Sequence, residues 1–415
     1  MIATTHNSLS RATEARRHGA RSLTILRDSV SPWLVAVIGV LLPISTASAE
    51  PMFLAKQYTR CTACHYSPTG GGLLTPYGRL LSHRELSTGG GTATAPAAGE
   101  EDAPRGEQAF LYGALGSALG PVHLGVELRP SHLRIGFPGG SASKDFVMNA
   151  DLIAAVQKKG WTAYGSVGRE PANSAIREGR TLPDAAFISY EHWIGYETED
   201  GLGFRAGRFL PAYGIRFSDH SAYSRTYLDL DRNDQVYGVE VSDTMGPSLL
   251  QVMLSPGKAE AVLHDNRRRG FSTAGRWQLD VTPRATLVGS AFYRHATDLD
   301  PKSGAVGGAF GFAPATRVTI WTEADANVQV AARGGRTWVV VNETSVEAYR
   351  GLWLKFSPQL RTAGGPGFPE LRRLAFEVDF LPRTHWNLGL SYYHDHNQTF
   401  DVTTSTLLLQ LHAYL

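Results

Sequence analysis

From residue 107 onward, apolar and polar residues alternate in runs of about ten residues that are separated by turn signals. A period of two is typical of β-strands, because successive side chains point to opposite faces of a sheet. The two faces of one such run are Leu374, Phe376, Val378 and Phe380 against Arg373, Glu377 and Asp379. The same alternation recurs in 318–325, 386–393 and 407–415. The pattern predicts an all-β protein.

Charged residues on one face of so many runs indicate which kind of β-protein this is. A sandwich needs apolar inner faces, whereas a transmembrane β-barrel shows its apolar face to lipid and its polar face to a wet lumen. Short turns at 280–284, 312–317 and 380–383 predict hairpins with periplasmic turns, and the polar stretches 264–270 and 361–369 predict external loops. We predict that residues 107–415 form an antiparallel barrel of about 16 strands, an even number as in bacterial barrels. A soluble all-β protein is the alternative.

Two features of this region stand apart from the regular pattern. The chain ends in Leu415, where the last residue of an outer-membrane barrel is typically aromatic. The stretch 211–234 is too long for a turn and mixes aromatic, basic and acidic residues. Such a composition predicts a loop that folds inward and narrows or plugs the barrel, and a mobile external loop is the alternative.

The first 49 residues resemble a secretory signal peptide. Five arginines precede an apolar run at 33–44, which is followed by Ala47, Ser48 and Ala49. The run is shorter than the roughly 20 residues that cross a bilayer, so cleavage after Ala49 and export are expected. An uncleaved amphipathic anchor is the alternative.

Both cysteines of the chain lie in Cys61-Thr62-Ala63-Cys64-His65. A zinc site would need further ligands at matched spacing, and a thioredoxin-like dithiol would need a βαβ pattern around it. The spacing instead fits c-type haem attachment, in which two thiols bind the vinyl groups of one haem and the next histidine ligates the iron. We therefore predict one covalent haem c on Cys61 and Cys64, with His65 as the proximal ligand. A surface disulfide is the alternative.

The sixth iron ligand is less determined by the sequence. His83, at the end of the expected short helix 77–83, and Met52 are candidates, although most histidines on short helices are simply solvated. The haem segment at 50–87 is too short to bury its cofactor unaided, so another part of the chain has to shield it. The Gly-, Ala-, Thr- and Pro-rich stretch 88–106 is a predicted linker.

Composition adds little about partners. The hydrophobic content of 42% suits strands that are half exposed to water, and the formal charge is only +2. The cluster 267–269 of three arginines is isolated, so no nucleic-acid partner is expected. His394, Asp395 and His396 are candidate ferrous-iron ligands at the outer rim, with solvated loop side chains as the alternative.

Several of these motifs together resemble the outer-membrane cytochrome–porin fusions, some of which serve iron-oxidising bacteria. The resemblance rests on the Cys61-x-x-Cys64-His65 sequence, on 67–72 and 77–79, and on the residues at 211–220. It implies one N-terminal c-type haem that sits in or at the mouth of a barrel. On this chain the family's haem residues map onto Cys61, Cys64 and His65 only.

The expected protein is thus an electron-transfer protein of the outer membrane rather than a conventional enzyme. It would carry electrons between an extracellular donor or acceptor, with ferrous iron as a candidate, and a periplasmic carrier such as a soluble cytochrome. With an even strand count both barrel ends are periplasmic, so the haem segment would enter from that side. A passive porin with a structural haem segment and a haem-based ligand-binding protein are the alternatives.

Overall fold

The computed structural model describes residues 51–89, 110–113, 120–170, 186–228, 230, 234–258, 270–296, 302–330, 336–362 and 369–415. The expected signal peptide at 1–49 and most of the expected linker lie outside these residues. All of the described residues belong to one compact unit, Ile44–Leu415. Among them, no helix is both long enough and apolar enough to cross a bilayer.

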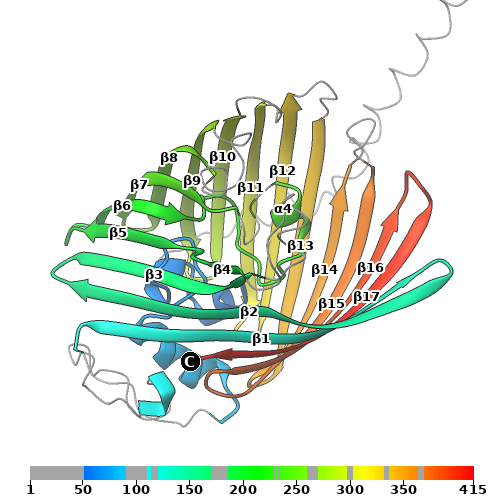
Figure 1. Cartoon of the computed structure of the whole chain (residues 1–415), viewed down its shortest axis with the longest axis horizontal. Helices are drawn as coiled ribbons and strands as arrows, with labels where there is room; N and C mark the ends of the chain where they lie inside the picture. Colours follow the sequence, from blue (N-terminus) through cyan, green and yellow to red (C-terminus); the bar gives the residue numbers. More distant parts are fainter. Residues whose placement is uncertain are drawn as a thin grey trace, which may run out of the picture. The chain divides into compact units, whose positions relative to one another are not determined.

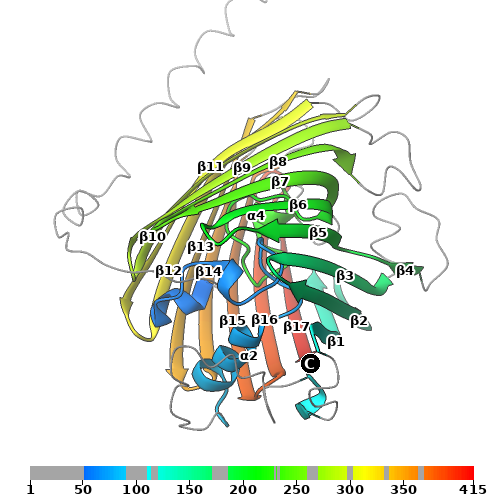
Figure 2. The same cartoon turned by 90° about the vertical axis from the view of Figure 1, so that its left-hand side faces the viewer.

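The described strands form one closed antiparallel sheet, shown from two sides in Figures 1 and 2. The strands are β1 (Val122–Phe137), β2 (Gly140–Lys158), β3 (Trp161–Glu170), β4 (Ala186–Ile188), β5 (His192–Glu197), β6 (Leu202–Phe209), β7 (Val236–Met245), β8 (Ser248–Lys258), β9 (Gly270–Thr282), β10 (Ala285–Ala296), β11 (Lys302–Ala315), β12 (Val318–Val330), β13 (Arg336–Tyr349), β14 (Leu352–Arg361), β15 (Leu371–Arg383), β16 (Trp386–Asn397) and β17 (Val402–Tyr414). The short helices are η2 (Pro51–Lys56), η3 (Cys61–Ala63), α2 (Pro76–Leu81), η4 (Ser82–Leu86), η6 (Phe110–Gly113) and α4 (Tyr223–Thr226).

The first and last strands close the barrel. β1 pairs with β2 on one side and with β17 on the other, where Glu127 lies opposite Tyr414. β4 and β5 both pair with β3, one after the other, and so share one position in the ring. The barrel therefore has 16 strand positions, which confirms the predicted antiparallel barrel and its strand number.

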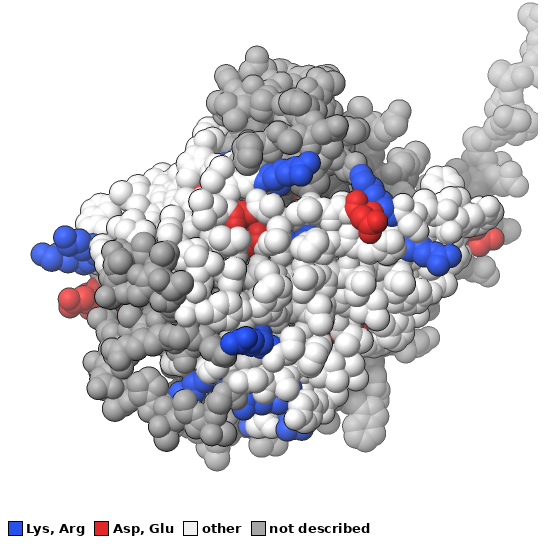
Figure 3. Space-filling view, turned by 60° about the horizontal axis from the view of Figure 1, so that its bottom comes forward, with Lys and Arg blue, Asp and Glu red and all other residues white. Residues whose placement is uncertain are grey.

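The side chains of the strands alternate between an apolar outer face and a polar inner face, as predicted. Leu374 and Phe376 of β15 are exposed on the outer surface, whereas Glu377, the residue after Phe376, is buried inside. Glu323 and Asp325 of β12 likewise point into the interior, both nearly inaccessible to solvent. Figure 3 shows one face of the molecule, on which most of the described surface is uncharged. The barrel is apolar outside and charged inside, the reverse of a soluble protein.

The predicted turns are largely confirmed. β9 ends at Thr282 and β10 begins at Ala285, and the hairpin of β11 and β12 turns at 316–317. The turn predicted at 380–383 is wrong, because β15 continues to Arg383 and the chain reverses at 384–385. A register shift between Phe380 and Arg383 accommodates the proline within the strand, and His385 takes the positive φ of the turn. Most of the predicted external loops at 264–270 and 361–369 lie outside the described residues.

The described residues of the stretch 211–234, called the inserted loop, fold into the lumen as predicted. The hydroxyl of Tyr213 donates to Oδ1 of Asp325 at 2.7 Å, and the backbone N–H of Gly214 donates to Oγ of Ser290 at 2.9 Å. Farther along, the backbone N–H of Tyr223 donates to the side chain of β14 residue Gln359. These contacts cross from the β6–β7 connection to the wall of β10, β12 and β14, so the loop occupies part of the lumen.

Candidate functional site

Residues 51–89, called the N-terminal segment, lie inside the barrel at the end where the C-terminus is marked (Figures 1 and 2). Met52, Phe53, Leu54 and Ala55 pack into an apolar cluster that includes inward-facing Trp321 of β12 and Trp353 of β14. Nζ of Lys56 lies 2.6 Å from Oε2 of Glu347 on β13. The barrel therefore supplies the shielding that a segment of this length cannot give itself.

Polar contacts hold the other end of the segment. Oγ of Ser82 and the hydroxyl of Tyr414 are 2.8 Å apart, and the side chain of Thr88 donates to the carbonyl of Arg350. The guanidinium of Arg79 donates to the carbonyl of Leu124 on β1. These partners lie near the short turns, so the segment occupies the short-turn end of the lumen.

The Cys-x-x-Cys-His sequence forms a single tight turn. η3 spans Cys61–Ala63, and the backbone N–H groups of Cys64 and His65 both donate to the carbonyl of Cys61, at 3.1 and 3.0 Å. The two thiols are not joined in a disulfide. Thr75 braces the turn, because its N–H donates to the carbonyl of Cys64 and its hydroxyl to the carbonyl of Ala63. The two cysteines and the histidine thus lie on one compact, hydrogen-bonded element.

The glycine-rich stretch 67–72 turns the chain back beside this element, and its three glycines all have positive φ values. The backbone of His65 pairs with that of Leu74 in an isolated bridge. A side chain at Gly72 would overlap the hydroxyl of Tyr164 on β3, and one at Gly71 would overlap the guanidinium of Arg216. Both glycines are needed for backbone conformation and for close approach to neighbours.

Two adjoining cavities border this element. The first, called the apolar cavity, has a volume of about 150 Å³. The second, called the polar cavity, has a volume of about 200 Å³ and reaches the inserted loop at His220 and Arg225. Apolar walls of the first include Met52, Phe53, Leu73, Leu86, Ile153 and Leu381. Charged walls of the second include Arg129, Arg216, Lys355, Asp151, Glu191 and Glu377. His65 borders both cavities.

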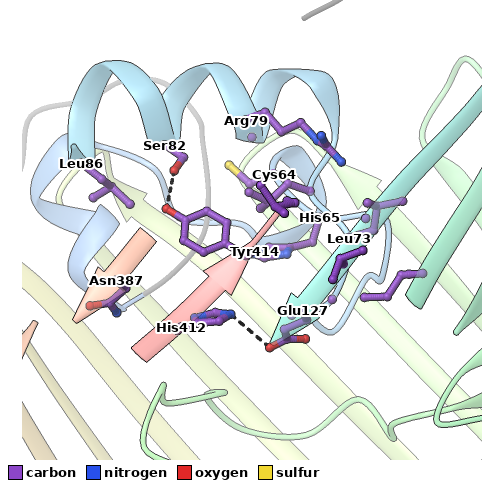
Figure 4. Close-up of a pocket in the computed structure, with 18 of the residues that line it drawn as sticks. Cys64, His65, Leu73, Arg79, Ser82, Leu86, Glu127, Asn387, His412 and Tyr414 are labelled. Atoms are coloured by element: carbon purple, nitrogen blue, oxygen red, sulfur yellow. Dashed lines mark hydrogen bonds and ion pairs between the residues drawn. The ribbon is translucent and has the colours of Figure 1, made fainter. Parts of the chain in front are cut away.

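Figure 4 shows His65 among the residues that line the apolar cavity, with Cys64 beside it. Burial, helped by the positive charge of Arg216, lowers the pKa of His65 to about 4. Its imidazole is therefore neutral at neutral pH, which is the form that ligates a metal. Nδ1 of His65 is buried and has no hydrogen-bond partner among the described residues. The same ring makes a hydrogen bond with the backbone of Gly71, so only Nδ1 lacks a partner among the described residues.

The predicted sixth-ligand candidates are placed differently. His83 lies on η4, where its Nδ1 is 2.7 Å from the hydroxyl of Thr384, and it is not in the wall of either cavity. Met52 lies in the walls of both cavities. Its role and that of His83 toward an iron stay predictions.

The candidate iron site at the rim is divided between two faces of β16. Asp395 points inward, where Nε of Arg373 lies 2.7 Å from its Oδ1, and Tyr223 donates to the same oxygen. The neighbouring histidine His396 instead pairs with Thr403 on the exposed side. In the part of the chain that the structure describes, no group of three or more His, Cys, Asp or Glu residues is placed to hold a metal ion.

The cavity walls also contain residues that the motifs did not single out. His412 of β17 and Glu127 of β1 line both cavities, with Nε2 of His412 3.4 Å from Oε1 of Glu127. Arg129 lies beside them, 2.6 Å from the same carboxylate oxygen. Alternation placed His412 on the polar face of the last strand, but only the closed barrel shows that this face lines the same cavities as His65.

No protein-family model matches the chain, and a search of curated proteins finds no match. Solved structures do match. The high-pH structure of Pseudomonas putida OprB aligns with a TM-score of 0.58 at 10% identity, over 75% of this chain and 99% of that one. The barrel has the porin fold. An anion-selective porin from Comamonas acidovorans aligns with a TM-score of 0.53 at 9% identity, over 71% of this chain and 99% of that one. At these identities the likeness of the porin barrel concerns fold alone.

Proposed function

We propose that this protein is an outer-membrane electron-transfer protein, in which a porin barrel encloses one covalent haem c. Cys61 and Cys64 would hold the haem through thioethers, and His65 would be the proximal iron ligand. The observation that carries the proposal is the position of the Cys-x-x-Cys-His turn, inside the barrel and against the two cavities.

The outer surface of the barrel supports the membrane location. Large apolar side chains are exposed along the strands, among them Leu250, Trp277, Phe310, Trp338, Leu354 and Leu409. Buried ion pairs such as Arg205–Glu240 stay inside. In outer-membrane barrels the short turns are periplasmic and the longer connections are extracellular. By that rule the N-terminal segment lies at the periplasmic mouth.

The residues around the Cys-x-x-Cys-His turn fit a haem. A haem has a flat apolar ring and two carboxylates, so it requires an apolar wall beside a positively charged one. The apolar cavity supplies the first, and the polar cavity, whose wall carries both charges, contains Arg129 and Arg216 for the second. The buried, unpartnered Nδ1 of His65 and the two unbridged thiols complete the set.

When bound, the haem supplies a centre that accepts and releases one electron. The chain does the remaining work. The barrel wall and the inserted loop exclude bulk water from the cavities, which lowers the local dielectric and raises the effect of nearby charges. Thr75 and the carbonyl of Cys61 fix the turn that carries His65. Arginines of the polar cavity would neutralise the two carboxylates of the haem.

We assign one electron-transfer partner to each end of the lumen. The N-terminal segment would exchange electrons with a periplasmic carrier, such as a soluble cytochrome. The polar cavity extends toward the inserted loop at His220, which by the porin rule is on the extracellular side. An extracellular donor or acceptor would act there, with ferrous iron as a candidate.

The test is expression with a cytochrome maturation system, followed by reconstitution of the purified protein into liposomes. We expect covalent haem that is reduced by a membrane-impermeant donor outside and reoxidised by an acceptor enclosed within. A Cys61→Ala, Cys64→Ala variant should fold without haem and should transfer no electrons. A colourless wild-type protein, or one that is found in the soluble fraction, would contradict the proposal.

A passive porin is the second candidate, and the porin fold itself favours it. The N-terminal segment and the inserted loop both occupy the lumen, which argues for a small conductance. Planar-bilayer currents of ordinary porin size that are the same in the wild type and in Cys64→Ala would favour the passive porin.

A further inference from the structure

A second histidine, on the last strand of the barrel, lies in the wall of the candidate site. His412 of β17 lines the same two cavities as His65, and Figure 4 shows both imidazoles at the edge of the apolar cavity. The side chain of His412 is 19% exposed, and its Nε2 faces the carboxylate of Glu127. The ring is thus largely withdrawn from solvent, in the wall that also contains His65.

The surroundings of His412 are those of a metal-ligating histidine. Oε1 of Glu127 lies 3.4 Å from Nε2, and the pair is drawn as a dashed line in Figure 4. Ligating histidines almost always direct their second ring nitrogen at a carboxylate or carbonyl, which fixes the tautomer. Arg129 in turn holds Glu127 at 2.6 Å and lies 2.6 Å from Nε2 of His220 in the inserted loop. Arg129 therefore holds the same carboxylate oxygen that faces His412.

The two other candidates have different surroundings. Met52 also lines both cavities, but it is part of the apolar cluster that anchors η2 to the wall of the barrel. His83 is engaged by Thr384 and borders neither cavity. Among these three, only His412 combines a place in the walls of both cavities with a carboxylate that orients its ring.

We propose that His412 is the sixth ligand of the haem iron and that Glu127 is its positioning residue. This inference depends on the proposed function, because it requires the haem to be present. Two histidines would give a six-coordinate, low-spin iron that does not bind carbon monoxide readily. This ligand pair also gives a lower potential than histidine with methionine, and it suits electron transfer rather than ligand chemistry.

The experiment uses the purified, haem-loaded full-length protein in detergent. We expect a low-spin ferric spectrum in the wild type and a high-spin spectrum with rapid carbon monoxide binding after reduction in His412→Ala. Added imidazole should restore the low-spin spectrum of His412→Ala. The matched variants Met52→Leu and His83→Ala should remain low-spin. Glu127→Gln should keep the low-spin spectrum but raise the midpoint potential, since the imidazole loses its carboxylate partner.

Haem staining and the heat-dependent gel mobility of the barrel establish that each variant is folded and loaded. If the wild type carries no covalent haem, the proposed function itself fails. If haem is attached but His412→Ala stays low-spin, or Met52→Leu becomes high-spin, the assignment of His412 is overturned while the proposed function stands. A high-spin wild type that already binds carbon monoxide would overturn it as well.

Discussion

Arg60 and Asp280 form a buried ion pair between the N-terminal segment and strand β9, with Nε of the arginine 3.1 Å from Oδ2 of the aspartate. The two side chains are only 9% and 5% exposed, and Arg60 directly precedes Cys61. Gln278 adds a hydrogen bond to Asp280 and another to the carbonyl of Thr59. This pair therefore fixes the position of the cysteine turn relative to the barrel.

Loss of one partner should release the segment. We expect Arg60→Ala to weaken its attachment by about 3–5 kcal/mol, because the remaining carboxylate would be buried without its counter-charge. The measurement is the urea dependence of proteolytic cleavage within the segment. Arg372→Ala, which removes an exposed pair with Glu370, should leave this dependence unchanged. Equal effects of the two substitutions would show that the buried pair does not anchor the segment.

The glycine-rich stretch 67–72 should be sensitive to a single added methyl group. Gly72→Ala places a side chain against Tyr164 in a left-handed conformation that alone costs about 1–2 kcal/mol. We expect a smaller haem-loaded fraction, measured as haem per protein in purified barrels. Gly165→Ala is the control, since a side chain there meets open space. A normal haem content in Gly72→Ala would show that this loop does not shape the site.

The inserted loop should loosen when its buried hydrogen bond to β12 is removed. Tyr213→Phe leaves the carboxylate of Asp325 without its donor, which costs about 1–3 kcal/mol. We expect more frequent current fluctuations in single-channel recordings. Tyr293→Phe removes a hydroxyl on the exposed face and should behave as the wild type does. Fluctuations that are identical in all three proteins would place the mobile element elsewhere.

Removal of residues 51–87 should open the short-turn end of the lumen. The deleted residues fill the space between β12, β13 and the seam of β1 and β17, so we expect conductance to rise several-fold over the wild type. The measurement is single-channel current in planar bilayers, with heat-dependent gel mobility as the control for barrel folding. An unchanged current would mean that the inserted loop alone limits flow.

The strands were predictable because lipid and water impose opposite demands on alternate residues. The outward Leu374 and Phe376 and the inward Glu377 could be assigned from sequence alone. The exact end of β15 could not, since a bulge carries the strand past Pro382 to Arg383. The break between β4 and β5 is also invisible in the pattern, because both pieces pair with the same neighbouring strand.

The site was predictable only where it is local. Cys61, Cys64 and His65 form one turn, so their spacing was sufficient to propose their chemistry. His412 meets them through barrel closure, which depends on the register of β17 against β1 rather than on any nearby residue. Sequence alternation gives the face on which His412 lies but not its depth in the lumen. The depth of His412 in the lumen is set by the strand register of the closed barrel.

Inside the lumen, Arg216 of the inserted loop contacts the carbonyl of Gly70, while Arg276 of β9 holds the carbonyl of Gly214. The two elements that obstruct the lumen are thereby linked to each other as well as to the barrel wall. A displacement of the inserted loop would therefore disturb the glycine-rich stretch beside the cysteine turn, so that the channel and the candidate site are mechanically coupled.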